Sequence, residues 1–244
     1  MSIGQTALSG GRVLVVGVYL IDREHTTSEI AAELDRSREW TVEQKWMALG
    51  VADVPEGLRR ITAAARTTPA PKFALVNQLL ASVRLDDYAF VVVCDDDISL
   101  PPRFVDSYLE LVNIHGFALA QPARTHASYI DHPFVEQLAG IDARWTRFVE
   151  IGPLFSMRRD AAALIVPFDE SSPMGWGYDF AWPILLEAAG LRLGIVDATP
   201  VEHTMRRTLA YYDYDPVRAC MDEYLARRPH VTPGEAFVIV ESYA

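Results

Sequence analysis

Three consecutive aspartates, Asp95, Asp96 and Asp97, stand directly after a run of seven apolar residues, 88–94. Side chains alternate along a strand, so Asp95 and Asp97 are predicted to point to one side and Asp96 to the other if the strand geometry continues. Two carboxylates on one side repel unless a cation joins them, and such oxygen ligands suit Mg²⁺ or Mn²⁺, which bridge to substrate phosphates. The alternative is a solvated turn whose aspartates help to begin the next helix.

A second segment, Gly175-Trp176-Gly177-Tyr178-Asp179, precedes a predicted helix. Glycines on both sides of Trp176 allow a turn that exposes an aromatic face, and sugar rings stack on such faces. Asp179 is predicted at the N-cap or in the first turn, where the helix dipole favours its ionised form. An ionised carboxylate can accept a hydroxyl proton as a general base. The alternative is that Asp179 only caps the helix and that Trp176 fills the core.

His203 and two arginines, Arg206 and Arg207, follow the last predicted strand, 193–196. A histidine beyond this strand end faces the edge that holds the aspartates, which favours a role as a metal ligand. The two arginines are placed to meet a diphosphate, because guanidinium groups bind phosphate oxygens through paired hydrogen bonds. A surface histidine and a solvated pair of arginines would explain the same residues.

Buried strands and amphipathic helices must position these residues. Residues 13–20 form a continuous apolar run, which is typical of a strand buried on both faces in a parallel sheet. Strands and helices alternate through the first half of the chain, which predicts an α/β fold with a mainly parallel central sheet flanked by helices. Charged residues at the carboxyl end of such a strand lie where these folds bind ligands. Strands are predicted over 13–20, 40–49, 88–94, 117–121, 147–151 and 193–196, helices over 28–38, 72–84, 104–115, 157–166 and 179–189, and a loop over 205–215.

The composition narrows the class of partner. The chain has 244 residues, 33 acidic and 22 basic side chains and a formal net charge of −11. This balance argues against nucleic acid or an anionic membrane as the main partner, since both bind clustered Lys and Arg. Cys94 and Cys220 stand far apart, which indicates no disulfide framework and no zinc-ribbon site. The longest apolar run, 13–21, is too short to cross a bilayer, so we expect a cytoplasmic protein without a transmembrane segment.

Taken together, these segments resemble the GT-A type of nucleotide-sugar-dependent glycosyltransferase. The likeness rests on Asp95-Asp96-Asp97 as a DxD motif, on the Gly-Trp-Gly-x-Asp segment, on the strand before Asp197 and on His203 beyond it. The chain most resembles an uncharacterised glycosyltransferase-like family that shares the order of further short motifs over roughly residues 72–208. Those motifs are Gln121-Pro122-Ala123, Phe148-Val149-Glu150 and Pro153-Leu154-Phe155-Ser156.

The resemblance implies one GT-A-like, Rossmann-like domain over residues 1–244, and no Pro/Gly/Ser-rich linker divides the chain. Its nucleotide-binding half would cover about residues 12–121 and its acceptor and catalytic half about 122–215, followed by a C-terminal extension, 216–244. Acceptor choice would depend on loops such as 124–143 and on the tyrosine cluster 211–214.

Roles for single residues follow from the same resemblance. Asp97 and His203 would bind the divalent cation, Mn²⁺ or Mg²⁺. Asp179 would be the general base, although the related inverting enzymes carry a longer acidic run where Phe180 follows here. Asp95 would touch the ribose or the base of the nucleotide. The other residues expected around the nucleotide and its diphosphate are Val18, Lys72, Asn77, Asp96, Trp176, Gly177, Arg206 and Arg207.

The implied activity is metal-dependent transfer of a sugar, of hexosyltransferase type, from a UDP- or GDP-sugar to a hydroxyl group of a small molecule or glycan. A base opposite the leaving diphosphate predicts inversion at the anomeric carbon. A nucleotidyltransferase of related fold is one alternative, but its usual glycine-rich, basic loop after the first strand is replaced by residues 21–25, which contain no glycine. A non-catalytic module that binds nucleotide or carbohydrate is the other alternative.

Overall fold

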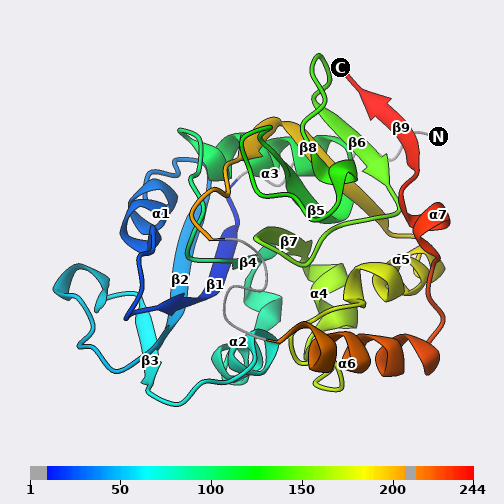
Figure 1. Cartoon of the computed structure of the whole chain (residues 1–244). Helices are drawn as coiled ribbons and strands as arrows, with labels where there is room; N and C mark the ends of the chain where they lie inside the picture. The colour runs from blue at the N-terminus through cyan, green and yellow to red at the C-terminus, as the bar shows by residue number, and fades with distance from the viewer. Residues whose placement is uncertain (1–9, 207–212) are drawn as a thin grey trace.

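One mixed β-sheet runs through the part of the chain that the structure, a computed structural model, describes: residues 10–206 and 213–244 (Figure 1). The strand order is β3-β2-β1-β4-β7-β5-β8-β6-β9. The strands are β1 (Arg12–Leu20), β2 (Thr41–Leu49), β3 (Thr62–Arg66), β4 (Phe90–Cys94), β5 (Phe117–Arg124), β6 (Ala143–Thr146), β7 (Leu154–Arg158), β8 (Arg192–Val201) and β9 (Ile239–Tyr243). The helices are α1 (Thr27–Leu34), α2 (Lys72–Leu80), α3 (Phe104–Ile114), α4 (Arg159–Ile165), α5 (Tyr178–Ala188), α6 (Tyr214–Ala226) and α7 (Pro233–Ala236), and single 3-10 turns lie at Glu56–Leu58, Leu85–Asp87 and Pro133–Val135.

The sheet has a parallel half and a mixed half. Strands β3, β2, β1 and β4 are parallel to one another, and β5 is parallel to β8. Strand β7 lies between β4 and β5 and is antiparallel to both, and β6 is antiparallel to β8 and β9. The predicted α/β class is therefore confirmed, with a sheet that is parallel around β1 and mixed beyond β4.

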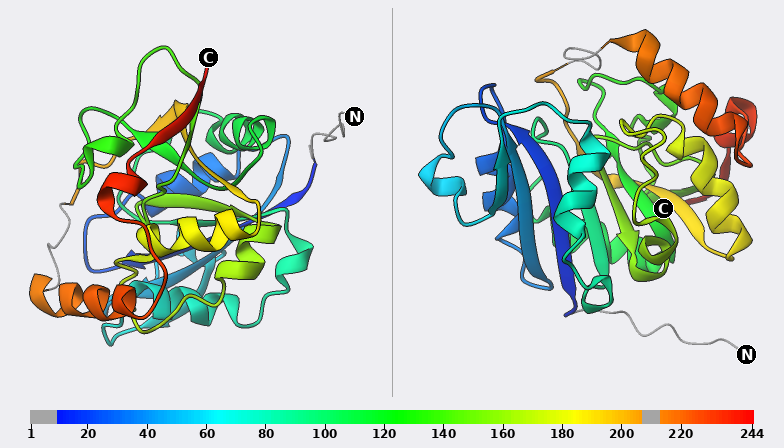
Figure 2. Two further views of the ribbon diagram at one scale, coloured as in Figure 1. Left: turned by 90° about the vertical axis from the view of Figure 1, so that its right-hand side faces the viewer. Right: turned by 90° about the horizontal axis from the view of Figure 1, so that it is seen from below.

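Helices cover both faces of the sheet (Figures 1 and 2), and an apolar layer lies beneath them on each face. Helices α1 and α3 pack on one face, where Val13 and Val15 of β1 point, and α2, α4 and α5 pack on the other, where Leu14 and Val16 point. All four valine and leucine side chains are buried. This burial on both faces is the reason why β1 is a continuous apolar run, as the sequence predicts.

Several predicted boundaries were wrong. The strand predicted over 147–151 lies instead at Ala143–Thr146, and 147–151 is a loop whose Phe148 and Val149 are fully buried. Their apolar character reflects this burial and does not mark a strand. The helix predicted over 157–166 begins only at Arg159, because the residues before it form β7.

Other differences lie near the ends of elements and in the last third of the chain. The helices predicted over 28–38 and 72–84 end at Leu34 and Leu80. Helix α6 begins at Tyr214, inside the predicted loop over 205–215, of which residues 207–212 lie outside the described part. Strands β3, β7 and β9 and helices α6 and α7 were not predicted. Among the described residues, every helix is too short or too polar to cross a bilayer.

Candidate functional site

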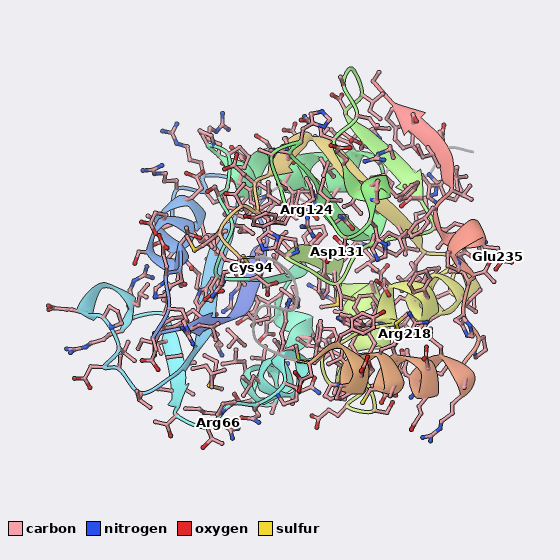
Figure 3. The ribbon with its side chains drawn as sticks, viewed as in Figure 1. Arg66, Cys94, Arg124, Asp131, Arg218 and Glu235 are labelled. Atoms are coloured by element: carbon pink, nitrogen blue, oxygen red, sulfur yellow. The ribbon has the colours of Figure 1, made fainter. Side chains whose placement is uncertain are left out.

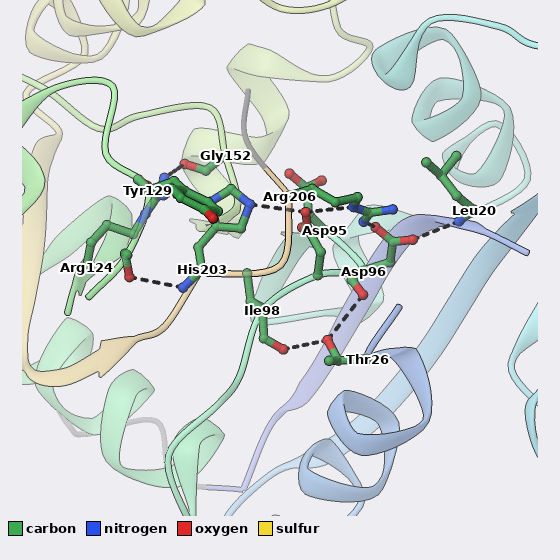
Figure 4. Close-up of polar contacts among 12 residues, drawn as sticks. Leu20, Thr26, Asp95, Asp96, Ile98, Arg124, Tyr129, Gly152, His203 and Arg206 are labelled. Atoms are coloured by element: carbon green, nitrogen blue, oxygen red, sulfur yellow. Dashed lines mark hydrogen bonds and ion pairs between the residues drawn. The ribbon is translucent and has the colours of Figure 1, made fainter. Parts of the chain in front are cut away.

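The three aspartates meet the segment around His203 at one edge of the sheet (Figure 4). The aspartates follow β4, whose parallel neighbour β1 ends beside them at Leu20, and His203 and Arg206 follow β8. In the wider view, Cys94 at the end of β4 and Arg124 at the end of β5 lie toward the middle of the molecule, whereas Arg66 lies at its periphery (Figure 3). This carboxyl edge is where sheets of this kind bind ligands.

The guanidinium group of Arg206 bridges two of the three aspartates. Its Nε donates to Oδ2 of Asp97 at 2.9 Å, and its Nη2 donates to Oδ1 of Asp96. The three side chains are only 6–11% exposed. Oδ2 of Asp96 also accepts the backbone N–H of Leu20 at 2.7 Å. The aspartate pair is therefore neutralised in part by an arginine that comes from the other end of the sequence.

The two bridged carboxyl groups differ in their pKa. Burial raises the pKa of Asp96 to about 6, although Arg206 and the Leu20 N–H oppose the rise. Burial also acts to raise the pKa of Asp97, but hydrogen bonds from His203 and Arg206 outweigh it and lower the pKa to about 2. Asp97 is therefore the carboxylate that stays ionised over the whole physiological range.

A chain of polar contacts continues from Asp97 into the protein. Nε2 of His203 lies 3.1 Å from Oδ2 of Asp97, and its Nδ1 lies 3.4 Å from Nη1 of Arg124. Nη2 of Arg124 donates to Oε2 of Glu150 at 2.5 Å, and both side chains are buried. Arg124 and Glu150 were not predicted as site residues. One signal for Arg124 was available, because it is a charged residue at the carboxyl end of β5.

Asp179 lies in the first turn of α5 and is buried. Burial, and then the negative charge of Glu150, raise the pKa of Asp179 to about 8, although backbone N–H groups of the first turn oppose the rise. The expectation that the helix N-terminus keeps this carboxyl ionised at pH 7 is therefore wrong, because loss of hydration outweighs the helix dipole. Burial also raises the pKa of Glu150, to about 7, against the opposing charge of Arg124.

Asp95 takes a different direction from the one that strand alternation predicts. Strand β4 ends at Cys94, so the alternation does not continue, and Asp96 and Asp97, rather than Asp95 and Asp97, share a cation. Oδ1 of Asp95 pairs instead with Nζ of Lys72 at 2.6 Å, and both side chains are partly exposed. Lys72, at the start of α2, therefore reaches the aspartate segment.

Asn77, also on α2, has a structural role in the protein. Its Nδ2 donates to the carbonyl of Phe168 at 2.8 Å, and its Oδ1 accepts the N–H of Phe168 at 2.9 Å. The Nδ2 group also donates to Glu170 at 3.1 Å. Both ends of the amide thus fix the loop after α4, and the expected place of Asn77 beside the nucleotide stays a prediction.

Glycine is favoured on both sides of Trp176, by packing at Gly175 and by the positive φ at both positions. A Cβ on Gly175, at φ +86°, would lie 2.2 Å from the ring of Phe73, and a Cβ on Gly177, at φ +92°, would lie 3.2 Å from Leu225 of α6. The Trp176 ring is half-buried, and its centroid lies 5.5 Å from that of Tyr214. The segment is therefore a tight turn before α5 that brings Trp176 against the first residue of α6.

The remaining predicted residues are placed less directly. Val18 is half-buried in β1, two residues before the end of the strand, and packs against the layer that contains α2. Arg207 and most of the tyrosine cluster 211–214 lie outside the described residues. Asp197 is a structural anchor in the middle of β8: it is fully buried and accepts two hydrogen bonds from Arg144, at 2.9 and 3.0 Å.

Buried polar atoms without a hydrogen-bond partner concentrate at this edge. In the described part of the chain six side-chain atoms are of this kind, and three belong to the site: Nε of Arg124, Nη1 of Arg206 and Oδ1 of Asp179. Buried polar groups in proteins are nearly always paired. Two guanidinium nitrogens and one carboxyl oxygen at this edge are therefore free to bind a ligand with acceptor and donor groups.

The fit of a divalent cation can be tested on the same atoms. Between residues 10–206 and 213–244, no group of three or more His, Cys, Asp or Glu side chains is arranged to hold a metal ion. Oδ2 of Asp97 and Nε2 of His203 are 3.1 Å apart, close to the roughly 3 Å that separates adjacent ligands of an ion bound at about 2.1 Å. Two protein ligands suffice for an ion that keeps waters and binds substrate phosphates, so the pair fits such an ion.

Comparison with known proteins relates the chain to others by fold. No family model matches it, and no curated protein sequence matches it. Its structure is similar to that of GalNAc-T7 crystallised with UDP, GalNAc and Mn²⁺ (TM-score 0.58, 10% identity, 87% of this chain and 47% of that chain). It is also similar to residues 1–349 of S. aureus TarS in complex with UDP-GlcNAc (TM-score 0.58, 11% identity, 86% and 64%). A third similar structure is the mannosyltransferase PcManGT from Pyrobaculum calidifontis in complex with GDP-Man and Mn²⁺ (TM-score 0.57, 16% identity, 93% and 67%).

These likenesses define the fold. The chain has the GT-A fold. Each of the three matches extends over most of this chain, from 86% to 93% of its length. It spans about half of the GalNAc-T7 chain and about two thirds of the TarS chain. At identities of 10–16%, the chemistry of this chain has to be argued from its own site.

Proposed function

We propose that this chain is a metal-dependent glycosyltransferase that moves a sugar from a nucleoside-diphosphate sugar to an acceptor hydroxyl. The observation that carries the proposal is the cluster of Asp97, His203 and Arg206 at the carboxyl edge of β4 and β8. It places two metal-binding atoms beside a guanidinium group with an unpaired nitrogen. Three GT-A structures solved with UDP, UDP-GlcNAc or GDP-Man support the same class of donor.

Asp97 and His203 would hold Mn²⁺ or Mg²⁺, and the ion would supply positive charge to neutralise the leaving diphosphate. Arg206, together with Arg207, binds phosphate oxygens through its planar set of N–H donors. The donor lies across both halves of the chain, 12–121 and 122–215, because Asp97 comes from the first and His203 from the second. Asp95 with Lys72, Asp96, Val18, and the Trp176-Gly177 turn complete the expected surroundings of the nucleotide and the sugar.

The reaction is a single in-line displacement with inversion. A bond forms between the acceptor oxygen and the anomeric carbon, while the bond from that carbon to the phosphate oxygen breaks and its electron pair leaves with the diphosphate. Asp179 takes the proton of the acceptor hydroxyl as general base. With a pKa of about 8 it binds a proton more strongly than an ordinary carboxylate, which favours general-base catalysis once it is ionised.

Nucleotide binding tests the proposal directly. We expect UDP or GDP with Mn²⁺ to raise the melting temperature, and neither Mn²⁺ nor nucleotide alone to do so to the same extent. A ligand at 100 times its dissociation constant adds about 2.7 kcal/mol of stability, which corresponds to roughly 5–10 °C for a chain of this length. The variant D97N removes the shift, and D222N, at an exposed site on α6, retains it. The proposal fails if no nucleoside diphosphate gives a shift that depends on Mn²⁺.

Turnover separates an enzyme from a binding module. Release of nucleoside diphosphate from UDP- or GDP-sugars, measured with and without candidate acceptors, identifies a transferase. The anomeric configuration of the product, measured by NMR, then decides the mechanism, since a product with the configuration of the donor excludes a single displacement. Binding without turnover of any donor would favour the non-catalytic module.

A further inference from the structure

One oxygen of the site already serves two partners. Oδ2 of Asp97 lies 3.1 Å from Nε2 of His203 and accepts the Nε–H of Arg206 at 2.9 Å. The other end of the same guanidinium group contacts Asp96. Figure 4 shows Arg206 held over the aspartate segment beside His203. In this structure, the guanidinium group that bridges Asp96 and Asp97 therefore belongs to the same chain, at Arg206.

A divalent ion on Asp97 and His203 would have to share this oxygen with the guanidinium group. Like charges a few ångströms apart in a buried site repel strongly, since water screens them poorly there. The three side chains are 6–11% exposed, so the interior offers little solvent to reduce that repulsion. Arg206 and the ion therefore compete for the same carboxylate.

Arg206 also has a donor nitrogen that favours its movement from Asp97 to a phosphate group. Its Nη1 is buried and has no hydrogen-bond partner among the described residues. A guanidinium group offers five N–H donors in one plane, and phosphate oxygens are their best-matched acceptors. A nucleoside diphosphate in the site would satisfy Nη1 and would supply negative charge beside the ion.

We propose that Arg206 occupies the cation position of the donor-free protein and moves from Asp97 to the diphosphate of the donor, so that metal and donor are accepted together. This inference rests on the proposed function. It implies that the metal alone binds weakly, because it must displace Arg206 without a phosphate to receive the guanidinium group. By linkage, each ligand raises the affinity for the other by the same factor.

Titration of the metal alone is the decisive experiment. Mn²⁺ binding is measured by isothermal titration calorimetry, and by electron paramagnetic resonance of the free ion, on wild type and on R206Q. We expect R206Q to bind Mn²⁺ at least about tenfold more tightly, which is the scale of one lost charge-assisted hydrogen bond. R206K keeps the charge but cannot bridge both aspartates, so its affinity lies between the two. With saturating Mn²⁺, R206Q binds UDP or GDP about tenfold more weakly than wild type.

Two controls separate this effect from a general change of charge or a loss of fold. R227Q removes one positive charge from an exposed pair at the end of α6 and leaves Mn²⁺ binding unchanged. The double variant R206Q/D97N loses the gained affinity, which locates the gain at Asp97. Far-UV circular dichroism and the melting temperature establish that each variant is folded.

The inference is overturned if R206Q binds Mn²⁺ no more tightly than wild type, or if the gain survives D97N. Those results leave the proposed function intact as long as wild type responds to nucleotide with Mn²⁺. Conversely, a wild-type protein that ignores every nucleoside diphosphate contradicts the proposed function, whereas the metal-only comparison still decides whether Arg206 excludes the ion.

Discussion

Replacement of Glu150 by glutamine tests how the charge of one buried carboxyl controls another. Glu150 accepts a hydrogen bond from Arg124 at 2.5 Å, and its negative charge is one cause of the raised pKa of Asp179. Glutamine keeps an acceptor for Arg124 and removes the charge. We therefore expect the pKa of Asp179 to fall in E150Q. It does not return to the ordinary value of a carboxyl, because burial, the largest cause of the rise, is unchanged.

The consequence at neutral pH is large. A carboxyl with a pKa of about 8 is about one tenth ionised at pH 7, and a fall of one unit makes it about half ionised. Tyr224, the other titratable group that interacts with Asp179, does not ionise in this range, since burial and then Asp179 raise its pKa to about 12. If Asp179 is the general base, turnover in wild type rises with pH up to about 8, and E150Q reaches its plateau at lower pH.

Carbon-13 NMR of the side-chain carboxyl groups measures this pKa without any substrate. The resonance of Asp179 is assigned by its absence in D179N, and its titration is followed in wild type, in E150Q and in the control E223Q. Glu223 forms an exposed pair on α6, so its replacement leaves the titration of Asp179 unchanged. The reasoning is refuted if Asp179 titrates at the same pH in E150Q and wild type. It is refuted equally if Asp179 titrates near 4 in the wild-type protein.

Three further predictions concern stability. The folded chain keeps a proton on Asp179 where the unfolded chain releases it, so stability falls as pH rises from about 4 to about 8, by up to about 1.4 kcal/mol for each unit. D179N is thus at least about 1 kcal/mol more stable than wild type at pH 8 in urea denaturation, and an equal stability at pH 8 would contradict this. D197N leaves buried Arg144 without its charge partner and lowers the free energy of unfolding by about 3 kcal/mol; a loss below 1 kcal/mol would show that Asp197 is no anchor. Gly175→Ala forces a Cβ into a phenylalanine ring at positive φ and costs about 2 kcal/mol or more, whereas Gly234→Ala, with nothing within 4 Å, changes stability little.

The sequence predicts the central strands well because burial on both faces leaves a continuous apolar run. Strands β1 and β4 are of this kind, and the predicted bounds agree with the structure to within two residues at each end. Apolar character alone does not distinguish a strand from a buried loop, which is why residues 147–151 were misassigned. Strand β9 was not predicted because four of its five residues are exposed, so no buried apolar run marks it in the sequence.

The site shows a similar division. The residue types at strand ends predict a polar edge and its main members, Asp97, His203 and Arg206, because each of them follows the carboxyl end of a strand, and β4 and β8 run in the same direction. Contacts between distant segments could not be predicted. Arg124 and Glu150, for example, come from separate segments that only the folded sheet brings into contact. The burial of Asp179 could not be predicted either. This burial raises the pKa of Asp179 by more than the helix dipole lowers it.

The order of strands in the sheet also bears on how the protein acquires its site during folding. The hydrogen bond from Arg206 to Asp97 joins residues 109 positions apart, and the contact from His203 to Asp97 spans 106. Closing such long loops costs chain entropy that only the assembled sheet compensates. Helices can therefore form before any nucleotide can be bound. In a refolding experiment, recovery of nucleotide binding will lag behind recovery of far-UV circular dichroism, which makes the ligand a reporter of the completed sheet.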